Sequence, residues 1–194
     1  MNESCEQAIT MLKEGNVVLL PTDTAYGLSC RIDSPDSINR ILDIKKRDAA
    51  QSMIVLVSDK EMLQKYVTGF SEDVERKILD RYWPGMLTVI LPCRTDLVSP
   101  LVRGERATLA LRMPAVSELR EIIMRVGVPI VSTSANLHGE KTPFELSDVD
   151  ARIKEQVDYI FPEAFTHASA SSTILDCTQS PWRILREGAV QLDI

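Results

Sequence analysis

Polar side chains interrupt an apolar stretch near the start of the chain, in the segment LLPTDTAYGLSC at residues 19–30. Thr22, Asp23 and Thr24 stand between two segments whose composition is that of a buried core. Open α/β sheets contact their ligands through polar groups at the ends of strands. The same residues are typical of a turn in which Thr and Asp side chains hydrogen-bond their own backbone. Taken alone, the segment favours the turn.

A cluster of cations stands at the end of a predicted helix, where Lys45, Lys46 and Arg47 are consecutive. Cations at this end of a helix interact favourably with its dipole, which is sufficient to explain them. An arginine fork beside a lysine point charge is also suited to phosphate. Both interpretations stay open while the cluster is considered by itself.

Hydroxyl groups follow another apolar segment, in VPIVSTSANLHGEKTP at residues 128–143. Ser132, Thr133 and Ser134 are followed by Asn136, so the segment offers hydrogen-bond donors and acceptors without a charge. This composition suits a carboxylate, a ribose or a phosphate. A capped loop would use the same residues.

Two arginines end apolar segments, Arg112 in LALRMP and Arg186 in RILREGA, and Ser172 and Thr173 precede a further one. For either arginine alone, a solvated strand end is the better explanation. Two such ends in one small sheet favour an anion site instead. With the hydroxyl groups and the lysine, they predict a pocket that binds polyanions and stabilises a charged transition state.

The sequence argues against several other kinds of site. It contains no G-x-S-x-G, no G-x-x-x-x-G-K-[ST] and no G-x-G-x-x-G segment, which disfavours nucleophilic and dinucleotide enzymes. His138 and His167 are the only histidines and no Cys-x-x-Cys pair exists, so we expect no metal site built from side chains. The formal charge of −6 opposes diffuse binding of nucleic acid.

The segment MNESCEQAITMLKEG at the start of the sequence is acidic and amphipathic, unlike a secretory signal. No apolar run approaches the roughly 18 residues of a membrane span. The four cysteines are far apart in the sequence, as expected of reduced thiols. We therefore expect a cytoplasmic protein without a membrane partner.

Helical and strand-like patterns alternate along the chain and predict the elements that position these residues. Ala8, Ile9 and Leu12 share a face of a first helix that ends at Gly15. Later helices are predicted from Ser34 with Pro35, from a Ser58–Glu61 capping box, from Ser71 up to 83–85, from Pro114 to Gly127 and near 147–157. Strands are predicted at 17–20, 53–57, 86–91, 107–113, 129–132, 158–161, 173–177 and 183–187. With 194 residues, the pattern predicts one twisted mixed α/β domain.

Six segments together carry a family resemblance: PTDTAYGL, the Lys-x-Arg at 45–47, WPGMLTVIL, LRMP, STSAN and SSTILD with ILREG. In this order, over about residues 10 to 190, they resemble the YrdC-like family of threonylcarbamoyl-AMP synthases. The resemblance implies a twisted, largely parallel α/β sheet, flanked by helices, around a deep and positively charged cavity. It also implies the short form of the family, with residues 1–194 as a single domain.

The resemblance implies a reaction as well. The family joins L-threonine, bicarbonate and ATP, with Mg²⁺ accompanying the ATP, to give threonylcarbamoyl-AMP and pyrophosphate. Downstream threonylcarbamoyl-transfer machinery uses this product to modify an adenosine of tRNA. A divergent protein that binds RNA or nucleotide with weak or no synthase activity is the alternative, and a carbamoyl-transfer module is a third.

Individual residues take roles from their positions in the family motifs. Those that resemble threonine contacts are Thr24, Arg112, Ser132 and Ser172. Those that resemble ATP contacts are Arg47, Gln51, Thr108, Ser134, Asn136, Thr142 and Arg186. Lys45 and Arg47 are the expected catalytic residues, because they would offset charge that develops on the phosphates.

The chain departs from the family pattern after Arg47. Family members usually have proline, asparagine and proline where this sequence has Asp48, Gln51 and Ser52. Asp48 adds a negative charge beside the expected phosphate site, which we expect to weaken it. Gln51 keeps an amide, and Leu56 replaces a polar threonine contact of some relatives.

Overall fold

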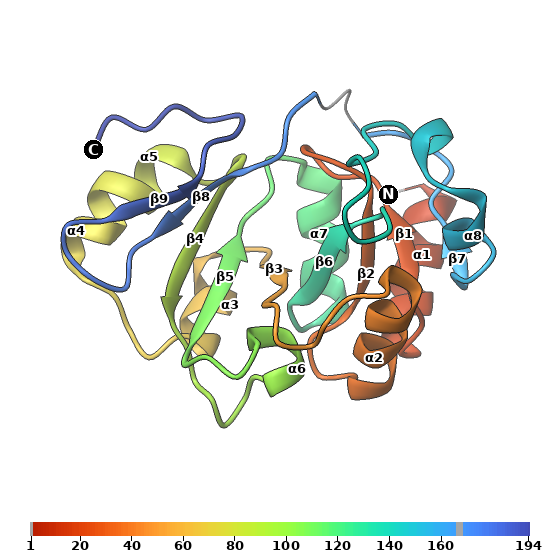
Figure 1. The fold of residues 1–194 in the computed structure, drawn as a ribbon, viewed down its shortest axis with the longest axis horizontal. Coiled ribbons are helices and arrows are strands. Elements are labelled where there is room, and N and C mark those ends of the chain that lie inside the picture. The colour runs from red at the N-terminus through yellow and green to blue at the C-terminus, as the bar shows by residue number, and fades with distance from the viewer. Residues whose placement is uncertain (1, 166–168) are drawn as a thin grey trace.

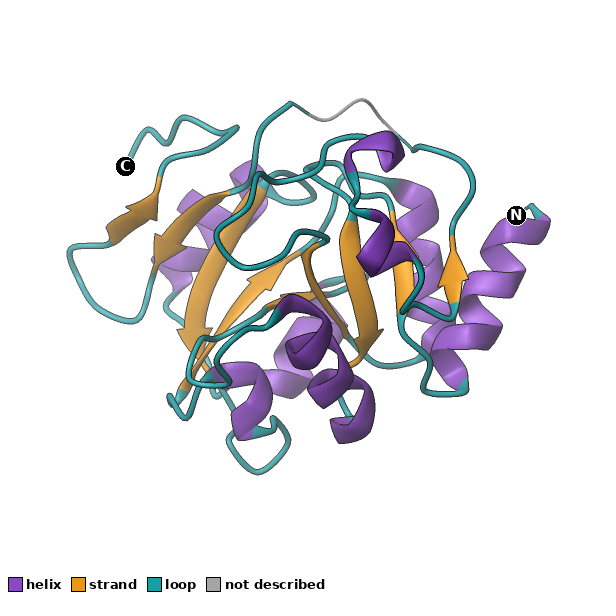
Figure 2. Ribbon diagram, turned by 45° about the vertical axis from the view of Figure 1, so that its right-hand side comes forward, coloured by secondary structure: helices purple, strands orange, loops and turns teal. Residues whose placement is uncertain are grey.

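The computed structural model describes residues 2–165 and 169–194. Its strands form one twisted sheet in the order β7-β1-β2-β6-β3-β5-β4-β8-β9, with helices on both faces (Figures 1 and 2). The strands are β1 Val18–Leu20, β2 Gly27–Arg31, β3 Ile54–Leu56, β4 Leu87–Pro92, β5 Thr108–Arg112, β6 Ile130–Ser134, β7 Tyr159–Ile160, β8 Thr173–Asp176 and β9 Arg183–Arg186. The predicted mixed α/β sheet is confirmed.

Parallel and antiparallel neighbours are interleaved in this sheet. The pairs β1–β7, β3–β5 and β4–β8 are parallel. The pairs β1–β2, β2–β6, β3–β6, β4–β5 and β8–β9 are antiparallel. Among the described strands the antiparallel pairs therefore outnumber the parallel ones, contrary to the balance that the family resemblance implied.

Most helices lie where the apolar periodicity placed them. They are α1 Glu3–Lys13, α2 Pro35–Lys45, α3 Lys60–Tyr66, α4 Glu72–Val74, α5 Asp80–Tyr82, α6 Pro100–Arg103, α7 Ser117–Val126 and α8 Ala151–Lys154. A π-helical turn at Glu75–Leu79 joins α4 to α5. The last predicted helix, near 147–157, is reduced to a 3₁₀ turn at Leu146–Asp148 and the short α8.

Helix ends follow the predicted residues with two differences. Ser71 caps α4 by accepting a hydrogen bond from the Val74 amide at 3.3 Å, as expected. Ser34 occupies the N-cap of α2, but its hydroxyl contacts the Ser37 hydroxyl at 2.7 Å instead of a backbone amide.

The prediction of a Ser58–Glu61 capping box is wrong, because the N-cap of α3 is one residue later, at Asp59. Asp59 caps α3, accepting a hydrogen bond from the Met62 amide at 2.7 Å, and Ser58 donates to the Asp59 carboxylate at 2.6 Å. A carboxylate is at least as good an N-cap as a hydroxyl and also interacts favourably with the helix dipole.

Strand β2 was not assigned from the sequence, although its segment has core-like composition. It lies between β1 and β6 and pairs with both, and four of its five residues are buried. Because both of its faces are covered, it lacks the alternation of a half-exposed strand.

The register of the strands places the polar residues of interest on one face of the sheet. Ser29 pairs with Ser132 and Gly27 with Ser134, so these four residues point to the same side. The same face continues across the neighbouring strands, because Leu56 of β3 pairs with Ile130 of β6 and with Arg112 of β5. Ile90 of β4 pairs with Ala110 of β5. Ile174 of β8 pairs with Thr88 of β4 and with Arg186 of β9. The predicted site therefore covers a sheet face, in addition to the ends of strands.

Candidate functional site

A cavity of about 200 Å³ lies over this face of the sheet. Loops wall it: the segment 21–26 after β1, the segment after α2 that includes Arg47 and Ser52, and the segment that carries Thr142. Its serine and threonine lining residues are Thr22, Thr24, Ser52, Ser132, Thr133, Ser134, Thr142, Ser171 and Ser172. Its charged lining residues are Arg47, Arg112 and Arg186, and no acidic residue of the described chain lines it.

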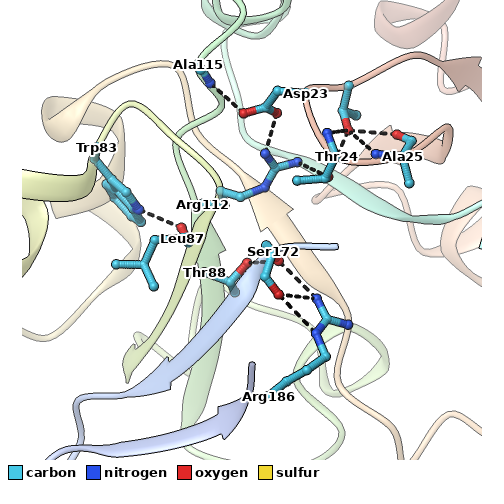
Figure 3. A network of polar contacts seen from close by, with 11 residues as sticks. Asp23, Thr24, Ala25, Trp83, Leu87, Thr88, Arg112, Ala115, Ser172 and Arg186 are labelled. Carbon is cyan, nitrogen blue, oxygen red and sulfur yellow. Dashed lines mark hydrogen bonds and ion pairs between the residues drawn. The ribbon is translucent and has the colours of Figure 1, made fainter. Parts of the chain in front are cut away.

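Arg112, at the end of β5, is held by the segment that follows β1 (Figure 3). Its Nη1 is paired with a carboxylate oxygen of Asp23, and its Nη2 donates to the Thr24 hydroxyl at 3.1 Å. The other Asp23 oxygen accepts a hydrogen bond from the Ala115 amide at 2.9 Å. Two side chains of this segment therefore orient the Arg112 guanidinium before any ligand binds.

The predicted self-capped turn is confirmed for Thr22 and not for Asp23. The Thr22 hydroxyl accepts hydrogen bonds from the amides of Thr24 at 3.0 Å and Ala25 at 3.1 Å. Asp23 turns away from its own backbone to reach Arg112, because a buried carboxylate needs a cationic partner.

Arg186, at the end of β9, forms a fork over the residue that precedes β8. Its Nε and Nη2 donate to the Ser172 carbonyl at 3.0 and 2.8 Å, and Nη2 also donates to the Ser172 hydroxyl at 3.0 Å (Figure 3). Gly188 makes this approach possible, because a Cβ there would collide with the backbone of Ser171 and Ser172. Partial burial lowers the pKa of Arg186, and the charge of Arg112 lowers it further.

Arg47 reaches the cavity from the loop after α2. Its Nη1 donates to the Thr133 hydroxyl at 3.1 Å and its Nη2 to the Ser52 carbonyl at 2.7 Å. Its Nε is buried without a hydrogen-bond partner. Burial lowers the pKa of this guanidinium, so an anion in the cavity would meet a poorly solvated cation.

Lys45 does not line the cavity. Its ammonium donates to the carbonyl oxygens of Ser134 and Asn136, the latter at 2.7 Å, and to the Asn136 side-chain oxygen at 3.2 Å. The residue is 3% exposed, and burial, followed by the charge of Arg47, lowers its pKa to about 7. It thus ties α2 to the loop after β6, and a direct phosphate contact stays a prediction.

The predicted residues divide into two groups. The structure brings Thr24, Arg47, Arg112, Ser132, Ser134, Thr142, Ser172 and Arg186 together around the cavity. Gln51 is exposed on the loop, Asn136 faces Lys45 and Glu140, and Thr108 lies four residues before Arg112 at the other end of β5; none of these three lines the cavity.

Asp48, the expected source of electrostatic weakening, is exposed and forms a local turn. Its side-chain oxygen accepts a hydrogen bond from the Ala50 amide at 2.9 Å. The carboxylate thereby stabilises a turn at the position where the resemblance led us to expect a proline. Leu56 is fully buried.

Metal-ligand chemistry does not match this lining. In the described part of the chain, no three His, Cys, Asp or Glu side chains gather as a metal site would require. Both oxygens of Asp23 are engaged by Arg112 and Ala115. His138 is exposed, and His167 lies outside the described residues.

Sequence reasoning missed several residues of the site. Tyr26, Gly27, Ser52, Thr133 and Ser171 line the cavity without having been assigned to it, and the last three each adjoin an assigned residue. Gly27 marks a close approach that only the structure reveals, because a Cβ there would collide with the Ser132 hydroxyl.

The fold and the site define a class: an α/β protein with a cavity, rich in arginine and hydroxyl groups, over one face of a mixed sheet. Residues 10–188 match the Sua5/YciO/YrdC family, whose description is telomere recombination. The chain belongs to this family, which confirms the resemblance. None of its described helices is long and apolar enough to cross a membrane.

Relatives carry a consistent name. The chain is 33% identical over 184 residues to threonylcarbamoyl-AMP synthase of Bacillus subtilis (strain 168), covering 95% of this chain and 53% of the relative. It is 31% identical over 170 residues to the synthase of Pseudoalteromonas translucida (strain TAC 125), covering 87% and 90%. The crystal structure of P. abyssi Sua5 complexed with L-threonine superposes with a TM-score of 0.90 at 29% identity, covering 97% of this chain and 55% of that one. This chain spans about half the length of the Bacillus subtilis relative and about half that of the threonylcarbamoyl-AMP synthase of Pyrococcus abyssi (strain GE5 / Orsay).

Proposed function

We propose that the protein is an L-threonylcarbamoyladenylate synthase, a nucleotidyltransferase that uses L-threonine, bicarbonate and ATP. One observation carries the proposal: three arginines and a ring of hydroxyls line a cavity whose described lining contains no acidic residue. Such a cavity suits a substrate set with a carboxylate, a carbamate and a triphosphate. The names of the relatives support the same activity.

The reaction needs no protein nucleophile. The amine of threonine and bicarbonate give a carbamate and water, and a carbamate oxygen then attacks the α-phosphorus of ATP. The new O–P bond forms as the bond to the β-phosphate oxygen breaks, and pyrophosphate leaves with the bonding pair. Positioned cations lower the barrier by stabilising charge that develops on the phosphates.

Threonine is assigned to the wall formed by Thr24, Arg112, Ser132 and Ser172. Arg112 is already oriented by Asp23 and Thr24, so holding the substrate carboxylate requires little reorganisation. The solved relative with L-threonine supports a threonine site in a fold of this type.

ATP is assigned to the wall formed by Arg47, Ser134, Thr142 and Arg186. Arg47 faces the phosphates in this assignment, with Lys45 holding the loop that carries Ser134. The contacts of Gln51, Thr108 and Asn136 with ATP stay predictions, because these residues lie outside the cavity lining. Mg²⁺ is proposed to arrive on the phosphate oxygens of the nucleotide, as it commonly does.

The product is proposed to pass to threonylcarbamoyl-transfer machinery that modifies tRNA. The four free, buried cysteines fit a reducing compartment, which supports the cytoplasm as the site of action. Direct RNA binding is the weaker proposal, because the chain carries a net charge of −6.

Pyrophosphate release tests the function directly. We expect release from MgATP only when threonine and bicarbonate are both present, and omission of either should abolish it. Release that ignores either omission would exclude the synthase. Arg47→Ala should reduce turnover at least about a hundredfold, as loss of one charge-stabilising group does. Arg183→Ala, at an exposed position of β9, is the matched control and should keep wild-type turnover.

A further inference from the structure

Thr88 is a buried residue of β4, between β5 and β8, and its side chain is on the face of the sheet that carries the cavity. It is fully buried in β4, and its hydroxyl oxygen lies 2.8 Å from the Ser172 hydroxyl oxygen (Figure 3). Ser172 is the only side-chain hydrogen-bond partner of Thr88 among the described residues. Thr88 does not line the cavity, so whatever it does for a ligand it does through Ser172.

The direction of this hydrogen bond follows from counting donors and acceptors. A hydroxyl has one proton and two acceptor positions. If Ser172 donated to Thr88, the Thr88 proton would be buried without an acceptor, which is costly. Thr88 is therefore the donor. Arg186 Nη2 donates to the same Ser172 oxygen at 3.0 Å, so both acceptor positions of Ser172 are filled.

The Ser172 proton is thus left free to point into the cavity. We propose that Thr88 is a positioning residue that sets Ser172 as a hydrogen-bond donor and so makes the threonine wall selective for an anionic oxygen. This inference rests on the proposed function, because it assigns the substrate carboxylate to Ser172 and Arg112. A neutral amide in place of the carboxylate offers the site a weaker acceptor.

The other serine of the threonine wall, Ser132, is oriented in the same way. Ser29, fully buried in β2, donates to the Ser132 hydroxyl at 3.1 Å. Ser132 thereby also keeps its own proton for the cavity. Two buried hydroxyls thus impose the same polarity on two lining serines, one on each side of Arg112.

Variants of Thr88 separate the hydroxyl from the packing. Thr88→Val keeps the shape and suits a strand, whereas Thr88→Ser keeps the hydroxyl. Calorimetric titration with L-threonine should show Kd raised about tenfold in Thr88→Val, in the range for a hydrogen bond to a charged group, and restored within about twofold in Thr88→Ser. The Kd for ATP should change less than about twofold. Thr10→Val, which removes a hydroxyl from the exposed face of α1, is the matched control.

The hydroxyl proton of Thr88 provides a test that needs no ligand. In NMR spectra of the wild-type protein, it should be protected from solvent exchange and show an NOE to the Ser172 β-protons. Unchanged threonine affinity in Thr88→Val, or a rapidly exchanging Thr88 hydroxyl, would overturn the inference. If the wild type binds no threonine, the proposed function fails, and the NMR result alone decides the polarity of the hydrogen bond.

Discussion

Arg112 and Asp23 form an ion pair in which only 4% and 6% of the two side-chain surfaces are exposed. Asp23 is also anchored by the Ala115 amide, so the pair joins the loop after β1 to the segment after β5. Because the loop after β1 and Arg112 itself both line the cavity, the ion pair couples the stability of the fold to the geometry of the site. Arg47 and Arg186 have no carboxylate partner among the described residues, so the cavity keeps a net positive charge.

Removing the charge of Asp23 should lower the free energy of unfolding substantially. Asp23→Asn leaves the Arg112 guanidinium buried without its counter-charge, and breaking such a pair costs about 3–5 kcal/mol. Urea unfolding measures the loss. The matched control is Asp33→Asn, which breaks the partly exposed pair with Arg31 and should cost about 1 kcal/mol or less. Equal losses in the two variants would contradict a special role for the buried pair.

Arg186 should not be replaceable by lysine. The fork of Nε and Nη2 on the Ser172 carbonyl requires a planar guanidinium, which a lysine ammonium cannot reproduce. We expect Arg186→Lys to raise the KM for ATP about tenfold, the loss of roughly one charge-assisted hydrogen bond. Steady-state kinetics with Arg183→Lys, three residues earlier on β9, gives the control. A wild-type KM for ATP in Arg186→Lys would contradict the assignment of ATP to the wall that contains Arg186.

Much of the site was predictable because its residues stand at recognisable positions. Arg112, Ser134 and Arg186 end apolar strands, and Thr24 and Ser172 adjoin others, so their gathering follows from the fold. The direction of the loop after α2 and the exposure of Gln51 did not follow, since both depend on the turn that Asp48 forms.

The pairing of Asp23 with Arg112 could not be predicted, because the two residues are 89 positions apart and a local turn would use the same carboxylate. The sequence gives no indication that Thr88 contacts a residue of the site, since threonine in a strand is expected from β-propensity alone. The cap of α3 was misplaced because Ser58 and Asp59 are adjacent and both are good N-caps. In each case a tertiary contact or a small energy difference decided between equivalent local choices.

The charge of Asp48 should weaken nucleotide binding only slightly. Asp48→Asn keeps the oxygen that accepts the Ala50 amide hydrogen bond, so the turn is preserved while the charge beside Arg47 is removed. Because the residue is exposed and screened by salt, we expect the KM for ATP to fall by only about twofold to threefold, less at high ionic strength. Asp43→Asn, on the preceding helix, should leave the KM unchanged. A tenfold fall would mean that Asp48 faces the phosphates directly.

Lys45 should make the stability of the protein depend on pH. Burial and the charge of Arg47 lower its pKa from 10.5 to about 7. Between these two values the unfolded chain binds more protons at this residue than the folded protein does, so the free energy of unfolding rises with pH. Below pH 7 both states are protonated, and the cost of burying the ammonium is present in full.

Lys45→Met isolates this contribution, because the other titrating groups are common to both proteins. Between pH 7 and 8.5, the free energy of unfolding should rise by about 1 to 2 kcal/mol more in the wild type than in Lys45→Met, measured by urea titration at each pH. A difference that stays constant with pH would show that the contacts with Ser134 and Asn136 keep the ammonium charged in the folded state. Lys46→Met, at the exposed neighbouring position, is the matched control and should reproduce the wild-type pH dependence.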